Sequence, residues 1–161
     1  MEIEFKWIDT EEALFEQVQT HRWINLLQPL GISFDYLENP NDQRPNSFHL
    51  VALKDDKVVG SCSLFHVEGS DRAKFYQMSV KKEFRGKGVG KKIILEMIRT
   101  LKEDQKIKTK NKLFEKKLNV LYCHGLQFAI GFYERLNFKK VGEMFVEEGY
   151  EHYKMEYDLN L

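Results

Sequence analysis

The stretch 78–92, with the sequence MSVKKEFRGKGVGKK, constrains the fold of this chain more than any other segment. Alternating bulky and β-branched residues fill positions 75–80, which is typical of a strand. From residue 89 to residue 101, apolar residues recur at helical spacing. Between these two patterns lie Gly86, Gly88 and Gly90. The sequence therefore predicts a strand and a helix joined by a glycine-rich loop.

This loop has the chemistry of a phosphate-binding site. The first N–H groups of a helix have no partner within the helix, and the helix dipole places partial positive charge at the same end. Glycines carry no Cβ atom that would keep a ligand away. Arg85, Lys87 and Lys91 add full positive charges around the loop. We therefore expect a site for a phosphorylated ligand, in particular a diphosphate, at the head of this helix.

The spacing of the glycines excludes one common phosphate motif and matches a second one poorly. It does not fit the Gly-x-x-x-x-Gly-Lys-Ser/Thr pattern of NTPases, and it has Gly-x-Gly-x-Gly where the dinucleotide fingerprint has Gly-x-Gly-x-x-Gly. It does match Arg/Gln-x-x-Gly-x-Gly/Ala, at Arg85, Gly88 and Gly90. In this the chain resembles the GNAT superfamily of N-acetyltransferases, whose coenzyme A diphosphate motif has this form. The match alone leaves open an ordinary glycine-rich turn or a nucleic-acid contact.

The composition favours one compact domain. The 161 residues are 42% hydrophobic and 13% aromatic, which suffices for a substantial core. The 25 basic and 25 acidic residues balance to zero net charge, which disfavours a nucleic-acid binder. Two distant cysteines and five scattered histidines indicate neither a disulfide framework nor a metal site. The N-terminal residues are charged, and no apolar run reaches the roughly 20 residues that span a bilayer, so we expect a soluble cytoplasmic protein without membrane contact.

Hydrophobic periodicity divides the chain into strands and helices. Residues 9–30 predict a helix, with a capping pattern at Asp9 and Glu12 and a break near His21. We expect further helices at 88–102 and 126–136, and strands at 2–8, 48–54, 57–67, 72–80, 118–123, 138–146 and 150–159. The order β-α(α)-β-β-β-α-β-α-β-β predicts an α/β (mixed α+β) domain over residues 1–161, with helices on the faces of the sheet. This is also the element order of the GNAT fold.

Two segments carry no clear pattern. Residues 33–46 hold turn signals around Pro40 and Pro45, and we expect either a substrate-recognition loop or a plain connection there. Residues 103–117 are highly charged, so we expect a solvated helix extension and loop, pinned to the body by Leu113 and Phe114.

A second stretch strengthens the resemblance. Residues 129–138, AIGFYERLNF, are similar to the family pattern Ala-x-x-Phe-Tyr-x-x-x-Gly-Phe. Asn137 replaces the glycine, and asparagine also adopts the left-handed conformation that ends a helix. Leu126 stands where the family often has an asparagine, so we expect one side-chain contact to the cofactor to be missing. The run 141–155 is similar to the ElaA-like branch, and the resemblance covers nearly the whole chain.

The resemblance implies acetyl-coenzyme A as the donor and co-substrate, and no metal. The strand 72–80 would splay from the next strand, and its backbone groups would bind the pantetheine arm in the V-shaped opening. The amides at the head of the helix would bind the diphosphate. The residues implied in cofactor binding are Met78, Ser79, Val80, Arg85, Gly86, Lys87, Gly88, Val89, Gly90, Lys91 and Phe132.

The resemblance also assigns a catalytic residue. Tyr133 matches the family's general acid, which protonates the departing sulfur. From the residues alone, Tyr133 would instead be a buried core tyrosine on an apolar helix face. A backbone amide near Met78 would stabilise the oxyanion of the reaction.

The general base is not evident from the sequence. Some relatives place a glutamate on the strand before the loop, but residues 74–80 include no carboxylate. The candidates are His66, Glu68, His124, His152 and a water chain to bulk solvent. Cys123 would suggest a covalent acetyl-enzyme, but its apolar surroundings fit a packed strand cysteine better.

The sequence thus favours an N-acetyltransferase that transfers the acetyl group of acetyl-coenzyme A directly to a primary amine of a small molecule or peptide. The alternative is a non-catalytic coenzyme A-binding module of the same fold. A nucleic-acid partner is disfavoured by the neutral net charge. The identity of the acceptor lies in variable loops that carry no motif, and edge strands near the C-terminus would allow a homodimer.

Overall fold

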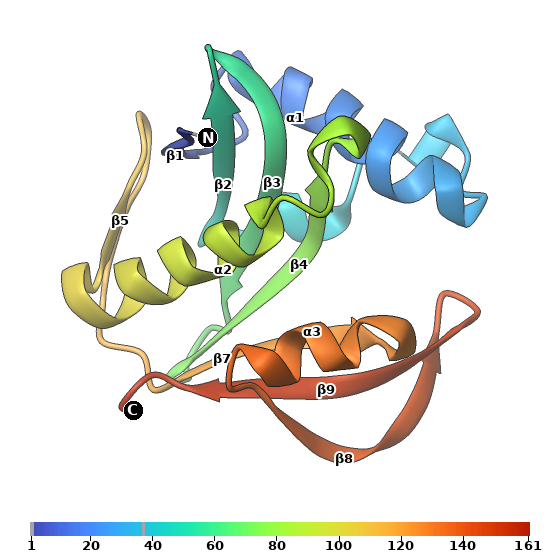
Figure 1. Ribbon diagram of the computed structural model, residues 1–161. Coiled ribbons are helices and arrows are strands. Elements are labelled where there is room, and N and C mark those ends of the chain that lie inside the picture. Colours follow the sequence, from blue (N-terminus) through green and yellow to red (C-terminus); the bar gives the residue numbers. More distant parts are fainter. Residues whose placement is uncertain (1, 37) are drawn as a thin grey trace.

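A seven-stranded sheet with the order β1-β2-β3-β4-β7-β9-β8 forms the body of the computed structural model, which describes residues 2–36 and 38–161 (Figure 1). Its strands are β1 Glu4–Ile8, β2 Ser47–Lys54, β3 Lys57–His66, β4 Arg72–Val80, β7 Val120–Leu126, β8 Lys139–Glu147 and β9 Tyr150–Asp158. A separate hairpin pairs β5 Lys106–Lys108 with β6 Leu113–Glu115. The α-helices are α1 Leu14–Arg22, α2 Val89–Arg99 and α3 Ile130–Arg135.

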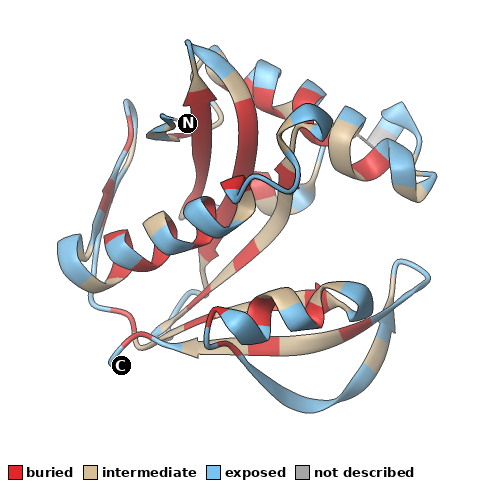
Figure 2. Ribbon diagram, in the orientation of Figure 1, coloured by how far each residue is buried: buried red, intermediate tan, exposed pale blue. Residues whose placement is uncertain are grey.

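Helices cover both faces of this sheet, as the element order predicts. One face carries α2 and α3 and holds the larger core, which includes Phe75, Ile93 and Tyr133. The other face of the first strands carries α1, whose Phe15 and Val18 pack with Ile8, Val51 and Leu53. Figure 2 shows the buried residues concentrated on β2, β3 and the sheet-facing side of α2. The predicted mixed α/β fold is therefore confirmed.

The sheet splays between β4 and β7. These two strands run parallel and pair only through 72–74 of β4 and 120–122 of β7. Among the described residues, none of 75–80 has a partner on β7, and Figure 1 shows β4 diverging from β7 beyond their short contact. A bulge in β4, where Gln77 (φ of 48°) and Met78 oppose the single residue Cys62 of β3, bends β4 in this region. The predicted V-shaped opening is confirmed.

The first helical region begins later than its capping pattern predicts. The Glu12 carboxylate accepts the Asp9 N–H at 2.9 Å, and the Asp9 carboxylate accepts the Glu11 N–H at 3.0 Å. These contacts close a separate turn, and α1 starts only at Leu14. The helix then continues as a π-helical turn, Trp23–Leu27, and a 3₁₀ turn, Gln28–Leu30, which ends at Gly31 with φ of 79°.

The connection 33–46 contains two 3₁₀ turns, Phe34–Tyr36 and Pro40–Gln43; Leu37, within it, lies outside the described residues. The remaining short helical segments are 3₁₀ turns at Lys82–Phe84 and Gln127–Ala129 and a π-helical turn at Thr100–Asp104.

The prediction of a solvated helix extension and loop at 103–117 is wrong in part. A π-helical turn does extend α2 to Asp104, but a β-hairpin follows it. The hairpin buries Ile107 and Phe114 in the core, whereas Leu113 stays exposed. Its turn is fixed by Asp9, whose carboxylate accepts the Thr109 hydroxyl at 2.6 Å and the Asn111 N–H at 2.9 Å.

The contacts of Asp9 predict a pH-dependent contribution to stability. Burial opposes its ionisation, but hydrogen bonds from Thr109 and Asn111 outweigh burial and lower its pKa from 3.8 to about 2. Because the folded pKa lies below the unfolded one, the contribution is present above pH 4 and is lost as the pH falls toward 2. We expect Asp9→Asn to remove about 2 kcal/mol of this pH-dependent free energy of unfolding.

Urea unfolding followed by tryptophan fluorescence at pH 6 and pH 2.5 measures this contribution. Asp56→Asn, in the exposed turn between β2 and β3, is the matched control. Equal loss of stability on acidification in Asp9→Asn and in the wild type would contradict the prediction.

The two borders of the sheet are β1 and β8. β8 is largely exposed, and its pairing with β9 is interrupted between Val141 and Phe145, where Gly142 has φ of 78°. Within the described residues, no helix has the length and apolar character needed to cross a bilayer.

Candidate active site

The glycine-rich loop has the backbone that its sequence predicts. Gly86 and Gly88 have φ of 75° and 81°, a region that disfavours side chains, and open space lies where their Cβ atoms would be. Gly88 is the N-cap of α2, and within residues 2–36 and 38–161 no side chain caps this end of the helix. The first N–H groups of α2 are therefore left available to an anion.

Gly90 lies against the opening in the sheet. A Cβ atom there would stand 3.7 Å from Met78 and Val80 of β4 and 3.7 Å from Phe132 of α3. A cavity of about 120 Å³ opens beside it, lined by Lys91, Phe132, Arg135 and Leu136. Gly90 thus lies between β4 and α3, and Lys91 and Arg135 border the cavity.

Arg85 is anchored by contacts that its motif does not predict. Its Nε donates to the Val80 carbonyl at 3.2 Å, and its Nη2 donates to the Asn25 carbonyl at 2.6 Å. The Asn25 side-chain oxygen also accepts the Lys82 N–H at 3.1 Å. His21 also contacts the end of β4, where its Nε2 donates to the Ser79 carbonyl at 3.4 Å. Burial lowers the pKa of His21 to about 4, so it is neutral there.

The other residues predicted to bind the cofactor differ in which of their groups are accessible to a ligand. Val89 is buried, so only its backbone is open to a ligand. Ser79 is buried, and its hydroxyl lies 3.4 Å from that of Ser61. The Lys87 ammonium lies 5.5 Å from the ring centre of Phe84 at the exposed loop.

Tyr133 lies in the core beneath the opening and is 8% exposed. Its ring centre is 5.8 Å from that of Phe75, 5.2 Å from Phe132 and 5.7 Å from Phe138. Gly125 of β7 allows this close approach, since a Cβ atom there would stand 3.2 Å from the tyrosine ring. Burial raises the pKa of Tyr133 well above its usual value, as does the neighbouring Cys123 thiol, so the phenol keeps its proton.

The two cysteines are both free and buried. Burial raises the pKa of the Cys62 thiol, and the nearby Cys123 adds to this effect. Burial likewise raises the pKa of Cys123. Neither thiol is a ready nucleophile, which favours the packed-cysteine interpretation of Cys123.

The four side chains predicted as candidate bases do not all lie together: His66 and Glu68 lie at and just after the end of β3, whereas His124 and His152 lie on the neighbouring strands β7 and β9. His66 lies at the end of β3, where its Nε2 contacts the Ser70 carbonyl at 2.7 Å and its ring packs on Phe114. Glu68 lies in the exposed turn after β3. His152 is buried on β9, with Nδ1 2.8 Å from the Tyr150 carbonyl. His124 lies on β7, directly beyond the residues that pair with β4.

A buried ionic network on the α1 side of β4 is not predicted from the sequence. The Arg22 Nη2 donates to Asp42 Oδ2 at 2.7 Å, and the Tyr76 hydroxyl donates to Asp42 Oδ1 at 2.5 Å. Arg22 and Asp42 are 0% and 1% exposed. His49 lies 3.9 Å from the same carboxylate, and burial lowers its pKa to about 4. The network ties the connection 38–46 to α1 and to β4 beside the opening.

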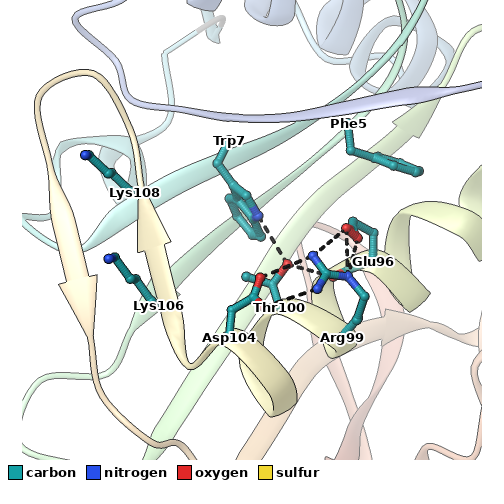
Figure 3. Close-up of a pocket in the computed structure, with 8 residues that line it drawn as sticks. All are labelled: Phe5, Trp7, Glu96, Arg99, Thr100, Asp104, Lys106 and Lys108. Carbon is teal, nitrogen blue, oxygen red and sulfur yellow. Dashed lines mark hydrogen bonds and ion pairs between the residues drawn. The ribbon is translucent and has the colours of Figure 1, made fainter.

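A larger cavity, of about 350 Å³, lies at the opposite end of α2. Figure 3 shows the Arg99 guanidinium beneath Trp7 and paired with Glu96 and Asp104. None of the residues predicted for the cofactor lines it; the lining residues are Phe5, Trp7, Glu96, Arg99, Thr100, Asp104, Lys106 and Lys108.

Comparison with known proteins agrees with this arrangement. The model of the acetyltransferase (GNAT) domain matches residues 45–140. Similar solved structures include ElaA of Escherichia coli, with a TM-score of 0.75 and 17% identity over 98% of this chain and 100% of that one. A putative N-acetyltransferase from Lactobacillus plantarum has a TM-score of 0.79 and 17% identity over 99% of each chain.

A third similar structure is the PaiA N-acetyltransferase from Thermoplasma acidophilum in complex with coenzyme A, with a TM-score of 0.69 and 17% identity over 98% of this chain and 99% of that one. The structural likeness shows the fold, and the domain match, which includes the glycine-rich loop and Tyr133, shows the family. The chain belongs to the GNAT acetyltransferases, a family of acyl-coenzyme A N-acyltransferases.

Proposed function

We propose that this protein transfers the acetyl group of acetyl-coenzyme A directly to a primary amine of a small molecule or peptide. The observation that carries the proposal is the uncapped N-terminus of α2, which opens beside the splayed edge of β4 and is bordered by Gly90 and Phe132. The coenzyme A complex of PaiA, a protein of the same fold, supports a coenzyme A ligand here.

The residues present fit this ligand. The N–H groups after Gly88 would bind the diphosphate, with Lys87 and Lys91 supplying charge. The pantetheine arm would lie along the unpaired edge of β4 at Met78 and Val80, in the manner of an added strand. The cavity of about 120 Å³ beside Lys91 and Arg135 offers further room at the diphosphate.

Tyr133 would act as the general acid. Its raised pKa keeps the proton on the phenol until the sulfur departs, and its ring is fixed by three aromatic neighbours. The backbone amide near Met78 would donate to the oxygen that becomes negatively charged during transfer.

A pair of substitutions at Gly90 tests the cofactor site. Gly90→Leu would fill the space between β4 and α3, so we expect coenzyme A affinity to fall at least about 10-fold. Gly90→Ala is the matched control: its Cβ fits at ordinary contact distance, the motif allows alanine, and the helix gains propensity. Calorimetric titration with coenzyme A measures both variants.

Activity is tested by following free thiol release from acetyl-coenzyme A over a panel of amines. We expect thiol release that requires both acetyl-coenzyme A and an amine. This release should be slower in Gly90→Leu. Coenzyme A binding without thiol release for any amine would instead support the non-catalytic module. Absence of coenzyme A binding by folded wild-type protein would overturn both functions.

A further inference from the structure

The two faces of β7 present different groups at the start of the opening. Cys123 and His124 are the first residues of β7 beyond its pairing with β4. Side chains alternate along a strand, so Cys123 faces α3 beside Tyr133, and His124 faces the opposite side. On β4, Lys74 and Tyr76 lie on that same opposite side, because Phe75 between them packs on Tyr133.

His124 is held in one orientation by its neighbours. Its Nδ1 lies 3.0 Å from Glu147 Oε2 and 3.3 Å from Oε1, at the end of β8. The Lys74 Nζ is 3.3 Å from the same nitrogen, and the Phe145 ring stands edge-on at 4.9 Å. Glu147 makes the shortest contact and its carboxylate can only accept a hydrogen bond, so we assign the proton to Nδ1 and the lone pair to Nε2. The His124 side chain remains 27% exposed.

We propose that His124 is the general base that deprotonates the acceptor amine, and that Glu147 is the positioning residue that fixes its tautomer. The proposal rests on the acetyl transfer proposed above. It assigns the base, His124 of β7, to one face of this strand and the acid, Tyr133 of α3, to the other face, so that the amine enters from the face opposite α3.

The protons balance in this arrangement. Nε2 of His124 takes one proton from the acceptor ammonium, and the freed nitrogen lone pair forms the C–N bond as the C–S bond breaks. The departing sulfur takes the Tyr133 proton. The second proton lost by the nitrogen as the amide forms restores the phenol through solvent, and the imidazolium releases its proton to water.

Groups from three strands surround the imidazole, namely Lys74 of β4, Glu147 of β8, and His152 and Lys154 of β9. Burial lowers the pKa of His124, Lys74 and His152 lower it further, and Glu147 raises it in part. The net shift is downward, so His124 is neutral and able to accept a proton at pH 7. His152 is less suited, because it is buried and stacked on Phe145.

The test is the pH profile of thiol release by His124→Gln with an amine that the wild type acetylates. We expect kcat at pH 7 to fall about 100-fold, the lower end of the usual effect of a general base. The deficit should shrink as the pH approaches the pKa of the amine, because free amine then needs no base. His66→Gln, at a histidine remote from the opening, is the matched control.

Glu147→Gln separates positioning from a structural role. It should lower kcat with an unchanged KM for acetyl-coenzyme A, and it should move the acidic limb of the profile to lower pH, since Glu147 raises the pKa of His124. Calorimetry with coenzyme A verifies that both variants keep the cofactor site.

The outcomes are distinguishable. A wild type that acetylates an amine while His124→Gln shows the same rate and pH profile overturns His124 as the base and leaves the proposed function intact. A deficit in His124→Gln that is constant over all pH values also overturns it, because this indicates a structural role. A wild type that releases no thiol with any amine overturns both proposals.

Discussion

Tyr133→Phe is expected to lower thiol release about 100- to 1000-fold while coenzyme A affinity stays within about twofold of the wild type. The substitution removes only the hydroxyl that would protonate the departing sulfur. The ring keeps its packing on Phe75, Phe132 and Phe138, so the core and the cofactor space remain intact. Steady-state thiol release and calorimetric titration measure the two quantities.

Tyr157→Phe is the matched control for this experiment. Tyr157 also packs on Phe138, at 5.4 Å between ring centres, but it lies on β9 at the far end from the cofactor loop. Its hydroxyl should be dispensable. Unchanged turnover in Tyr133→Phe would remove the phenol from the mechanism and return Tyr133 to the role of a core residue.

Asp42→Ala is expected to cost about 3–5 kcal/mol in the free energy of unfolding. The substitution leaves the Arg22 guanidinium fully buried without its carboxylate, and an uncompensated buried charge is far more costly than a lost surface pair. Since a domain of this kind has only about 5–15 kcal/mol of stability in total, the variant should unfold at much lower urea concentration. Urea titration followed by tryptophan fluorescence measures this.

Tyr76→Phe calibrates this result, because it removes one hydrogen bond to Asp42 and leaves the ion pair in place. It should cost about 1 kcal/mol. If Asp42→Ala cost no more than Tyr76→Phe, the Arg22–Asp42 pair would contribute nothing beyond an ordinary hydrogen bond.

The glycine-rich loop with its flanking strand and helix was predictable because its signals are local. The glycines at 86, 88 and 90 alternate within five residues, and a strand alternation and a helical periodicity flank this segment. The left-handed conformation of Asn137, with φ of 70°, follows from the same kind of local reasoning at the end of α3. Each of these features is formed within a few residues.

The opposite side was not predictable, because its contacts join distant segments. Arg22 meets Asp42 across 20 positions, and His124 meets both Lys74 and Glu147 across 50 and 23 positions. No periodicity marks such pairs. The β5–β6 hairpin escaped prediction for another reason: each strand has three residues, and the single buried residues Ile107 and Phe114 are hidden among lysines.

The interruption of β8 has a consequence for association with other chains. A border strand usually offers a continuous row of N–H and C=O groups on which a neighbour can extend the sheet. Here the bulge at Gly142 divides that row into two short runs, 139–141 and 145–147, whose directions differ. A strand of a second molecule could pair with only one of these runs at a time. The interruption therefore hinders aggregation through this edge, although β8 exposes the apolar side chains of Val141, Met144 and Val146.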